Sequence, residues 1–222
     1  MSIVLTKIKR FLRKIVPAAV WKFLQGINWK FLAMFYRIVP RPNVKAETSR
    51  AKPRRTQEGF FEKFCLGKGL DIGYGGDLLC SGCRGWDIED GDAQTLKGLP
   101  DGSFDFVYSS HCLEHLEDAG EALRNWWRVL KPGGYLILYL PERDLYERKK
   151  NLPSRWNTSH KRFFLLDRDE LPDTVGVLPL LEKTVRGYEI IKADICKNGY
   201  KITADNKQAQ GEYSIEVAVR KL

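Results

Sequence analysis

The sequence contains no uninterrupted run of apolar residues that approaches the roughly 20 needed for a helix to span a membrane. It also shows no secretory signal peptide and no periodic repeat, and its one biased tract is a basic stretch near residues 50–55. These absences argue against membrane-spanning and repeat classes, and we expect a cytoplasmic, globular protein. With 222 residues, 43% hydrophobic and 29% charged, the chain is long enough for one α/β domain and an additional segment.

Cysteine ligands for a metal are scarce. The chain has five cysteines, an odd number, and only Cys80 and Cys83 form a C-x-x-C pair. A structural zinc site normally takes four ligands, and no second pair of cysteines or histidines stands at a matching spacing. We therefore predict no metal site and interpret the two cysteines as small residues in a turn, with zinc or redox chemistry as the alternative.

Acidic residues are almost missing from the first quarter of the chain. Residues 1–55 hold 14 Lys or Arg and one acid, Glu47, whereas the remainder holds 23 basic and 27 acidic residues. The net charge of +9 therefore belongs to the N-terminal part, and the globular part is mildly acidic. Because a nucleic-acid-binding domain usually carries its own basic face, this distribution argues against nucleic acid as a partner of the domain.

Residues 1–39 have the pattern of a basic, amphipathic helical segment. On a helix of 100° per residue, the bulky apolar residues of positions 3–16 fall within an arc of about 140°, with Lys and Arg opposite. Pro17 ends or kinks this helix, and basic residues interrupt the apolar stretch that follows at 18–39. The pattern predicts contact with an anionic membrane surface, while packing on its own domain or on a partner protein is the alternative.

The next segment, residues 40–55, contains three prolines and many charges, which predicts a linker. We place the domain boundary there and expect the main domain over residues 56–222. Short apolar runs at 69–72 and 135–140 predict buried strands, and the helical pattern at 118–130 predicts a helix between them.

A glycine-rich turn follows the first predicted strand at once. Asp71 lies near the strand end and opens the pattern Asp-x-Gly-x-Gly with Gly73 and Gly75. Without a Cβ, glycine lets a ligand approach the backbone closely. The pattern differs from the G-x-G-x-x-G dinucleotide fingerprint. Another predicted strand, at 83–88, carries Asp87 near its end, where an acid can accept hydrogen bonds from both ribose hydroxyls.

Five blocks in order over residues 69–140 carry a resemblance to a known family. They read Leu-Asp-Ile-Gly-Tyr-Gly-Gly, Gly-Asp-Ala, Leu-Pro-Asp-Gly-Ser-Phe-Asp-Phe-Val, Leu-Glu-His-Leu and Arg-Val-Leu-Lys-Pro-Gly-Gly-Tyr-Leu. In this order and spacing they resemble the class I S-adenosylmethionine-dependent methyltransferases with a methyltransferase 11-type domain. The resemblance implies S-adenosyl-L-methionine as cofactor. It also implies a Rossmann-like, doubly wound α/β sheet with a C-terminal antiparallel hairpin, here residues 187–194 and 212–221.

The resemblance also implies roles for residues at the carboxyl edge of the sheet. Those that would bind the methionine end of the cofactor are Asp71, Gly73 and Gly75, with Tyr74 between them. Those that would bind its ribose and adenine are Asp87, Ile88, Asp92 and Ala93. Those that would lie near the sulfonium are Ser110 and His111.

One departure from the family pattern concerns the first two crossovers. Only 15 residues separate Asp71 from Asp87, and only four lie between Asp87 and Asp92. Neither gap has room for a helix with its loops. We therefore expect shortened early crossovers, which makes the roles of Asp87 and Asp92 depend on how these loops fold.

The stretch over residues 141–164 follows a predicted strand and is rich in polar, aromatic and basic groups. Loops at the carboxyl edge of a sheet often carry binding and catalysis. We predict that Tyr146 and Trp156 stack on the acceptor and that Arg155 binds its phosphate. His160 is a candidate general base, because its ordinary pKa suits proton removal near neutral pH, or else a structural loop residue.

The combined features predict a methyltransferase acting on an oxygen or, second, a nitrogen atom. The basic segment and the aromatic, basic loop favour a sugar, glycan, lipid-linked or other small-molecule acceptor of polysaccharide biosynthesis. The protein would then be cytoplasmic and peripheral on the inner face of the membrane. The alternatives are an RNA or protein methyltransferase, and a non-catalytic scaffold with the same fold.

Overall fold

The computed structural model describes residues 31–222, so the predicted helix over residues 3–16 lies outside the described residues. The chain divides into two compact units, of which one runs to Arg41 and includes Ile88–Asp90. In the described part of this unit, residues 31–38 are helical. Arg41 donates to both carboxylate oxygens of Glu89, at 2.6 and 2.9 Å.

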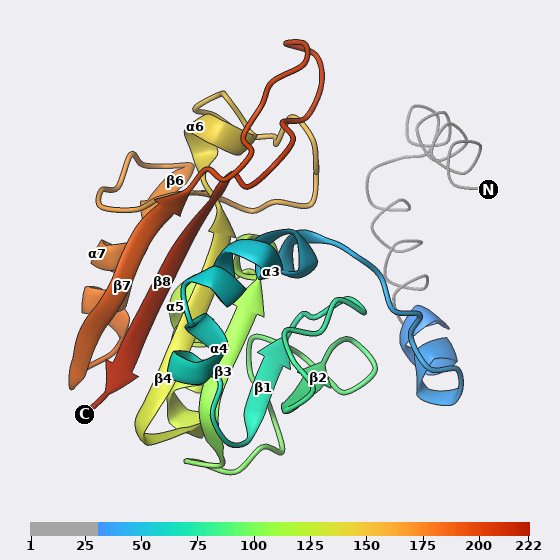
Figure 1. Cartoon of the computed structure of the whole chain (residues 1–222), viewed down its shortest axis with the longest axis vertical. Helices are drawn as coiled ribbons and strands as arrows, with labels where there is room; N and C mark the ends of the chain where they lie inside the picture. The colour runs from blue at the N-terminus through green and yellow to red at the C-terminus, as the bar shows by residue number, and fades with distance from the viewer. Residues whose placement is uncertain (1–30) are drawn as a thin grey trace. The chain divides into compact units, whose positions relative to one another are not determined.

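The other unit, Pro42–Asp87 with Gly91–Leu222, is built on a six-stranded sheet of order β2-β1-β3-β4-β8-β7. The first four of these strands run parallel, and β8 runs antiparallel to both β4 and β7 (Figure 1). This arrangement confirms the predicted α/β fold with a C-terminal antiparallel hairpin. The strands are β1 (Gly69–Ile72), β2 (Cys83–Trp86), β3 (Phe104–Ser110), β4 (Leu130–Pro141), β7 (Tyr188–Cys196) and β8 (Ser214–Lys221).

Helices cover both faces of the sheet, and each layer has its own core. One core joins the sheet to α5 and α7, and the other joins it to α3 and α4, which lie in front of the sheet in Figure 1. Strands β5 and β6 form a second, two-stranded parallel sheet, and Phe164 of β5 bridges to Glu142 directly after β4. The remaining elements are α3 (Glu47–Gln57), α4 (Phe60–Phe64), η1 (Leu113–His115), α5 (Ala119–Val129), α6 (Arg143–Tyr146), β5 (Phe163–Leu165), β6 (Thr174–Gly176) and α7 (Val177–Thr184).

The two early crossovers are short, as the spacing predicts. Residues 73–82 join β1 to β2, and residues 87–103 join β2 to β3, both through turns and irregular backbone without a helix. The first loop folds back on its strand, because the Leu79 N–H donates to Asp71 Oδ2 at 2.8 Å. The predicted helix over 118–130 is also present as α5, whose first turn is capped by the Asp118 carboxylate on the Glu121 N–H.

The predicted linker over residues 40–55 is wrong for its second half, which belongs to helix α3. Pro53 lies inside this helix, and Ala51 and Arg55 are buried on the sheet. Proline and dense charge normally favour an exposed, irregular segment. Here tertiary contacts override that preference, because the partners of the buried charge lie about 160 residues further along the chain.

Buried arginines attach α3 to the sheet. Arg55 is fully buried, and it donates to Glu216 Oε2 at 2.7 Å and to the Tyr108 hydroxyl at 2.9 Å. Arg54 donates to the carboxylates of both Glu212 and Glu216. Burial alone would raise the pKa of Glu216, but the two guanidinium groups outweigh burial and lower it. Glu216 is therefore ionised at neutral pH.

Removing the charge of Glu216 should destabilise the fold strongly. Glu216→Gln leaves Arg55 buried without its counter-charge, which costs about 3–5 kcal/mol of unfolding free energy. Urea unfolding at neutral pH measures the change. Glu117→Gln is the matched control, because Glu117 is 77% exposed in its pair with Lys161 and should cost about 0–1 kcal/mol. Equal losses in the two variants would contradict this account of the buried pair.

Candidate functional site

Asp71 is fully buried near the carboxyl end of β1. Its Oδ2 accepts the Leu79 N–H, while its Oδ1 has no hydrogen-bond partner among the described residues. Burial raises the pKa of Asp71 to about 8, against the smaller, opposite effect of the Leu79 hydrogen bond. A buried oxygen without a partner is costly, and carboxyl groups perturbed in this way are concentrated at functional sites.

The glycine turn after β1 has the backbone that its sequence predicts. Gly73 and Gly75 have φ angles of 71° and 58°, which favour glycine over other residues. A Cβ at Gly73 would lie 2.6 Å from Cys112 Sγ, whereas a Cβ at Gly75 would meet no atom closer than 3.9 Å. The Gly75 N–H donates to Asp87 Oδ2 at 2.9 Å. The structure thus brings Gly73, Gly75 and Asp87 together, and the Tyr74 ring packs on β2 against Gly85.

Of the other residues predicted to contact adenine, Asp92 and Ala93 make hydrogen bonds to nearby parts of the chain. Asp92 Oδ1 accepts the Gln94 N–H at 2.8 Å, which forms a local turn. The Ala93 carbonyl accepts the indole N–H of Trp126 at 2.8 Å, from helix α5. Ile88 belongs to the other compact unit, and its contact with adenine stays a prediction.

Ser110 and His111 stand at the carboxyl end of β3, as predicted from the strand pattern. His111 has a φ of 49°, and its Nε2 lies 2.9 Å from Ser214 Oγ on β8. Burial lowers the pKa of His111 well below its usual value, so the ring is neutral. The residue of this strand end that touches the glycine turn is Cys112, beside Gly73.

Asp77 is a structural residue of the site that sequence reasoning missed. Helix α3 begins at Glu47, and the side chain of its N-cap residue, Ala46, provides no cap. Asp77 supplies the cap instead, because its Oδ2 accepts the N–H groups of Ala46 and Ser49, both at 2.9 Å. The start of α3 is therefore bonded to the loop that contains Gly73 and Gly75. No local pattern signals such a cap, since donor and acceptor lie about 30 residues apart.

The residues predicted to bind an acceptor are largely engaged with one another. The Tyr146 ring stacks on the His160 ring with centroids 5.8 Å apart. The backbone carbonyl of Tyr146 accepts the Trp156 indole N–H at 2.7 Å. The Arg155 guanidinium lies over the Trp156 ring and donates to the Asp205 carbonyl. Tyr146, Trp156 and His160 thus form one group, with Arg155 at its exposed side.

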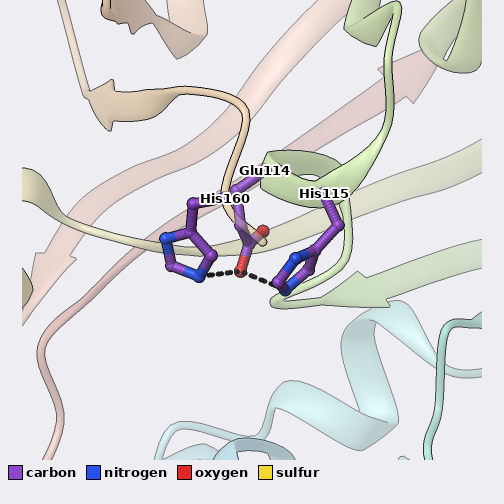
Figure 2. A group of neighbouring side chains, drawn as sticks. All are labelled: Glu114, His115 and His160. Atoms are coloured by element: carbon purple, nitrogen blue, oxygen red, sulfur yellow. Dashed lines mark ion pairs between the residues drawn. The ribbon is translucent and has the colours of Figure 1, made fainter. Parts of the chain in front are cut away.

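A second group of titratable side chains surrounds His160. Its Nδ1 lies 3.0 Å from Glu147 Oε1, and its Nε2 lies 3.9 Å from Glu114 Oε1. Glu114 is fully buried, and burial raises its pKa to about 7. His115 lies on the other side of Glu114 (Figure 2), and burial lowers its pKa to about 4. Glu114 and Glu147 were missed by sequence reasoning, although Glu114 stands in the Leu-Glu-His-Leu block.

Comparison with known proteins agrees with this geometry. Residues 70–138 match the sequence family described as "Methyltransferase domain". A "Probable S-adenosylmethionine-dependent methyltransferase" of Mycolicibacterium smegmatis is 28% identical over 162 residues, which cover 59% of this chain and 62% of that protein. The ubiquinone/menaquinone biosynthesis C-methyltransferase UbiE of Vibrio vulnificus is 49% identical over 40 residues, 18% of this chain and 15% of UbiE. The chain therefore spans less than two thirds of these curated relatives.

A solved structure from Bacillus halodurans, named as a candidate methyltransferase, shares the fold at a TM-score of 0.51 and 15% identity. The similarity covers 75% of this chain and 97% of that one. The strand order and the glycine turn define the Rossmann-like fold of class I methyltransferases. Residues 70–138 therefore match a methyltransferase domain, the chain has the fold of such enzymes, and S-adenosylmethionine is the cofactor that this match and fold imply.

The buried carboxyl of Asp71 should make stability depend on pH. Its pKa is about 8 in the folded chain against an ordinary value of 3.8. The folded state therefore holds an extra proton between these values, and stability is lost as pH rises toward 8. Asp71→Asn removes this effect. From about pH 5 to about pH 8, the unfolding free energy of wild type should fall relative to that of the variant by roughly 1 kcal/mol per pH unit.

Chemical unfolding at several pH values measures this difference. Asp105→Asn is the control, because a hydrogen bond from Lys131 lowers the pKa of Asp105, so its titration is complete below this window. A constant difference between wild type and Asp71→Asn would show that Asp71 is already ionised in the folded chain.

Proposed function

We propose that this chain transfers a methyl group from S-adenosylmethionine to an oxygen atom of a small-molecule acceptor. A nitrogen atom is the second candidate for the methylated position. The observation that carries the proposal is the grouping of three features at one edge of the sheet: the unpartnered Oδ1 of Asp71, the left-handed Gly73–Gly75 turn, and the carboxylate of Asp87, which directly follows the neighbouring strand β2. Ligands of open α/β sheets bind at this edge.

These residues fit the cofactor that the family implies. Asp87 would accept the ribose hydroxyls, and the unobstructed backbone at Gly75 admits close approach. The Oδ1 atom of Asp71, which has no hydrogen-bond partner among the described residues, would accept a hydrogen bond from the methionine end. The cofactor supplies an electrophilic methyl group on a sulfonium. The chain itself contributes position and alignment, and such transfer needs little acid–base help because a neutral thioether leaves.

The proposed class of methyl acceptor rests on the group of aromatic and basic side chains that follows β4. Tyr146, Trp156 and Arg155 offer aromatic faces and a cation, which suit a sugar ring or a phosphate-bearing, lipid-linked acceptor. The general-base role of His160 stays a prediction, supported by its contact with Glu147. Glycan and lipid-linked acceptors are favoured over RNA, because the domain is mildly acidic.

Cofactor binding should depend on Asp87. Titration calorimetry should show one equivalent of S-adenosylmethionine or S-adenosylhomocysteine bound by wild type. Asp87→Ala should weaken both roughly 10- to 100-fold, because a hydrogen bond to a charged group contributes about 1.5–3 kcal/mol. Asp101→Ala, in an exposed turn where Asp101 is 77% exposed, should leave both affinities unchanged. Absence of binding to wild type would support the non-catalytic scaffold instead.

Acceptor profiling tests the transfer itself. Cofactor carrying a labelled methyl group is incubated with the protein and with separated lipid, glycan, RNA and protein fractions of a cell extract. Label in the glycan or lipid fraction, lost in Asp87→Ala, supports the proposal. Label confined to RNA or protein overturns the acceptor class, and label in no fraction overturns the proposed transfer.

We also propose that residues 1–39 contact an anionic membrane surface. Among the described residues, no helix has the length and apolar character to cross a membrane. The helix over residues 31–38 nevertheless exposes four large apolar side chains at helical spacing, and the surrounding segment is strongly basic. A basic helix with an apolar stripe suits the boundary between headgroups and acyl chains. The four residues are Phe31, Met34, Phe35 and Ile38.

The protein should co-sediment with vesicles that contain anionic phospholipid, and binding should fall with added salt. Replacing Phe31 and Phe35 by serine should weaken binding roughly tenfold or more, because each buried phenyl ring contributes about 1.5–3 kcal/mol. Leu171→Ser, at a leucine that is 74% exposed elsewhere, is the control. Equal binding to neutral and anionic vesicles would contradict the proposal.

A further inference from the structure

All three histidines of the chain turn a ring nitrogen toward the same buried oxygen. Glu114 Oε1 lies 3.8 Å from His111 Nδ1, 3.8 Å from His115 Nε2 and 3.9 Å from His160 Nε2. Figure 2 shows Glu114 between His115 and His160. Glu114 is fully buried, and neither of its carboxylate oxygens has a hydrogen-bond partner among the described residues. Such a carboxylate normally has a partner.

The distances are too long for hydrogen bonds but suit groups that share a metal ion. A direct bond between ring nitrogen and carboxylate would need about 3 Å. One ligand atom from each of Glu114, His115 and His160 lies within 4.8 Å of the other two. Ligands about 2.0–2.2 Å from a tetrahedral metal lie roughly 3.3–3.6 Å from each other. Side-chain movements of about 1 Å would therefore close the site around an ion.

Each of the two histidines in this set already has its other nitrogen oriented. His160 Nδ1 lies 3.0 Å from Glu147 Oε1, and His115 Nδ1 lies 3.0 Å from Ser159 Oγ. Glu147 is itself fixed by the Arg155 N–H at 2.7 Å. Partners of this kind fix the ring and its tautomer in metal sites, and they leave Nε2 for the metal.

We propose that Glu114, His115 and His160 bind one divalent transition-metal ion. Two imidazoles and one carboxylate favour zinc or another first-row ion over magnesium and calcium, which prefer oxygen ligands. Three protein ligands leave a position for water or an acceptor oxygen. The assignment does not depend on methyl transfer. It replaces the general-base role of His160, because one Nε2 lone pair cannot both hold a metal and accept a proton.

The test is metal binding by the full chain after treatment with a chelator. Titration with Zn²⁺ alone, and with Co²⁺ as a spectroscopic probe, should show one equivalent bound and the ligand-field absorption of a nitrogen–oxygen site. Glu114→Gln and His160→Gln should each weaken binding at least roughly tenfold, with circular dichroism to verify folding. Glu117→Gln, the same change at an exposed carboxylate of the same segment, should bind as wild type does.

Two further variants separate loss of metal binding from loss of folding and from binding at the cysteines. His115→Gln alters a ligand that is 30% exposed, so it should fold even where a substitution at buried Glu114 does not. Replacing Cys80 and Cys83, whose sulfurs are 3.5 Å apart, by serine should leave binding unchanged. Failure of wild type to bind either ion, equal affinity in Glu114→Gln or His115→Gln, or loss of binding in the cysteine variant with thiolate absorption in wild type would overturn the assignment.

Discussion

The pairing of buried charges between α3 and β8 is the constraint on which the site depends. Arg55 and Glu216 are both fully buried, and a buried charge is tolerated only when its counter-charge is within bonding distance. This requirement fixes the helix on the sheet, since sliding by one turn would separate the pair. The other end of α3 is then in position for Asp77, which caps it from the glycine loop. The backbone shape of the glycine turn and the docking of α3 are therefore coupled.

Features of the fold and site that depend on local sequence patterns could be predicted, whereas those that depend on contacts between distant parts of the chain could not. Strands β1, β2 and β4 and the short crossovers followed from apolar patterns and gap lengths, which are local properties, whereas the final hairpin followed from the family resemblance. Asp71, Gly73 and Gly75 were also found from a local pattern. Helix α3 was missed because its charges look solvated until β8 supplies their partners. Glu114 was missed because lack of a hydrogen-bond partner is a property of the folded chain, even though its neighbour His115 lies in a recognised block.

The second crossover loop, residues 87–103, has no helix of its own and is held instead by helix α5. Side chains of α5 donate hydrogen bonds to backbone carbonyls of this loop. Trp126 donates to the Ala93 carbonyl at 2.8 Å, Asn125 to Gln94 at 3.1 Å and Arg128 to Leu99 at 2.8 Å. Since a buried loop must satisfy its own backbone, these bonds let an irregular segment cover the sheet. The bonds to Ala93 and Gln94 also hold the backbone beside Asp92 in place, although this loop contains no helix.

Two buried carboxyl groups stand beside adjacent strands of the sheet, and each lacks a partner for at least one oxygen. Asp71 belongs to β1, and Glu114 follows β3, which pairs directly with β1. The same chain pairs two other fully buried carboxylates, Glu212 and Glu216, with arginine. A fold that can supply counter-charges within itself has left these two positions without one. Both lie toward the edge where ligands of such sheets bind, and this is where we propose that the methionine end of the cofactor binds at Asp71 and a metal ion binds at Glu114.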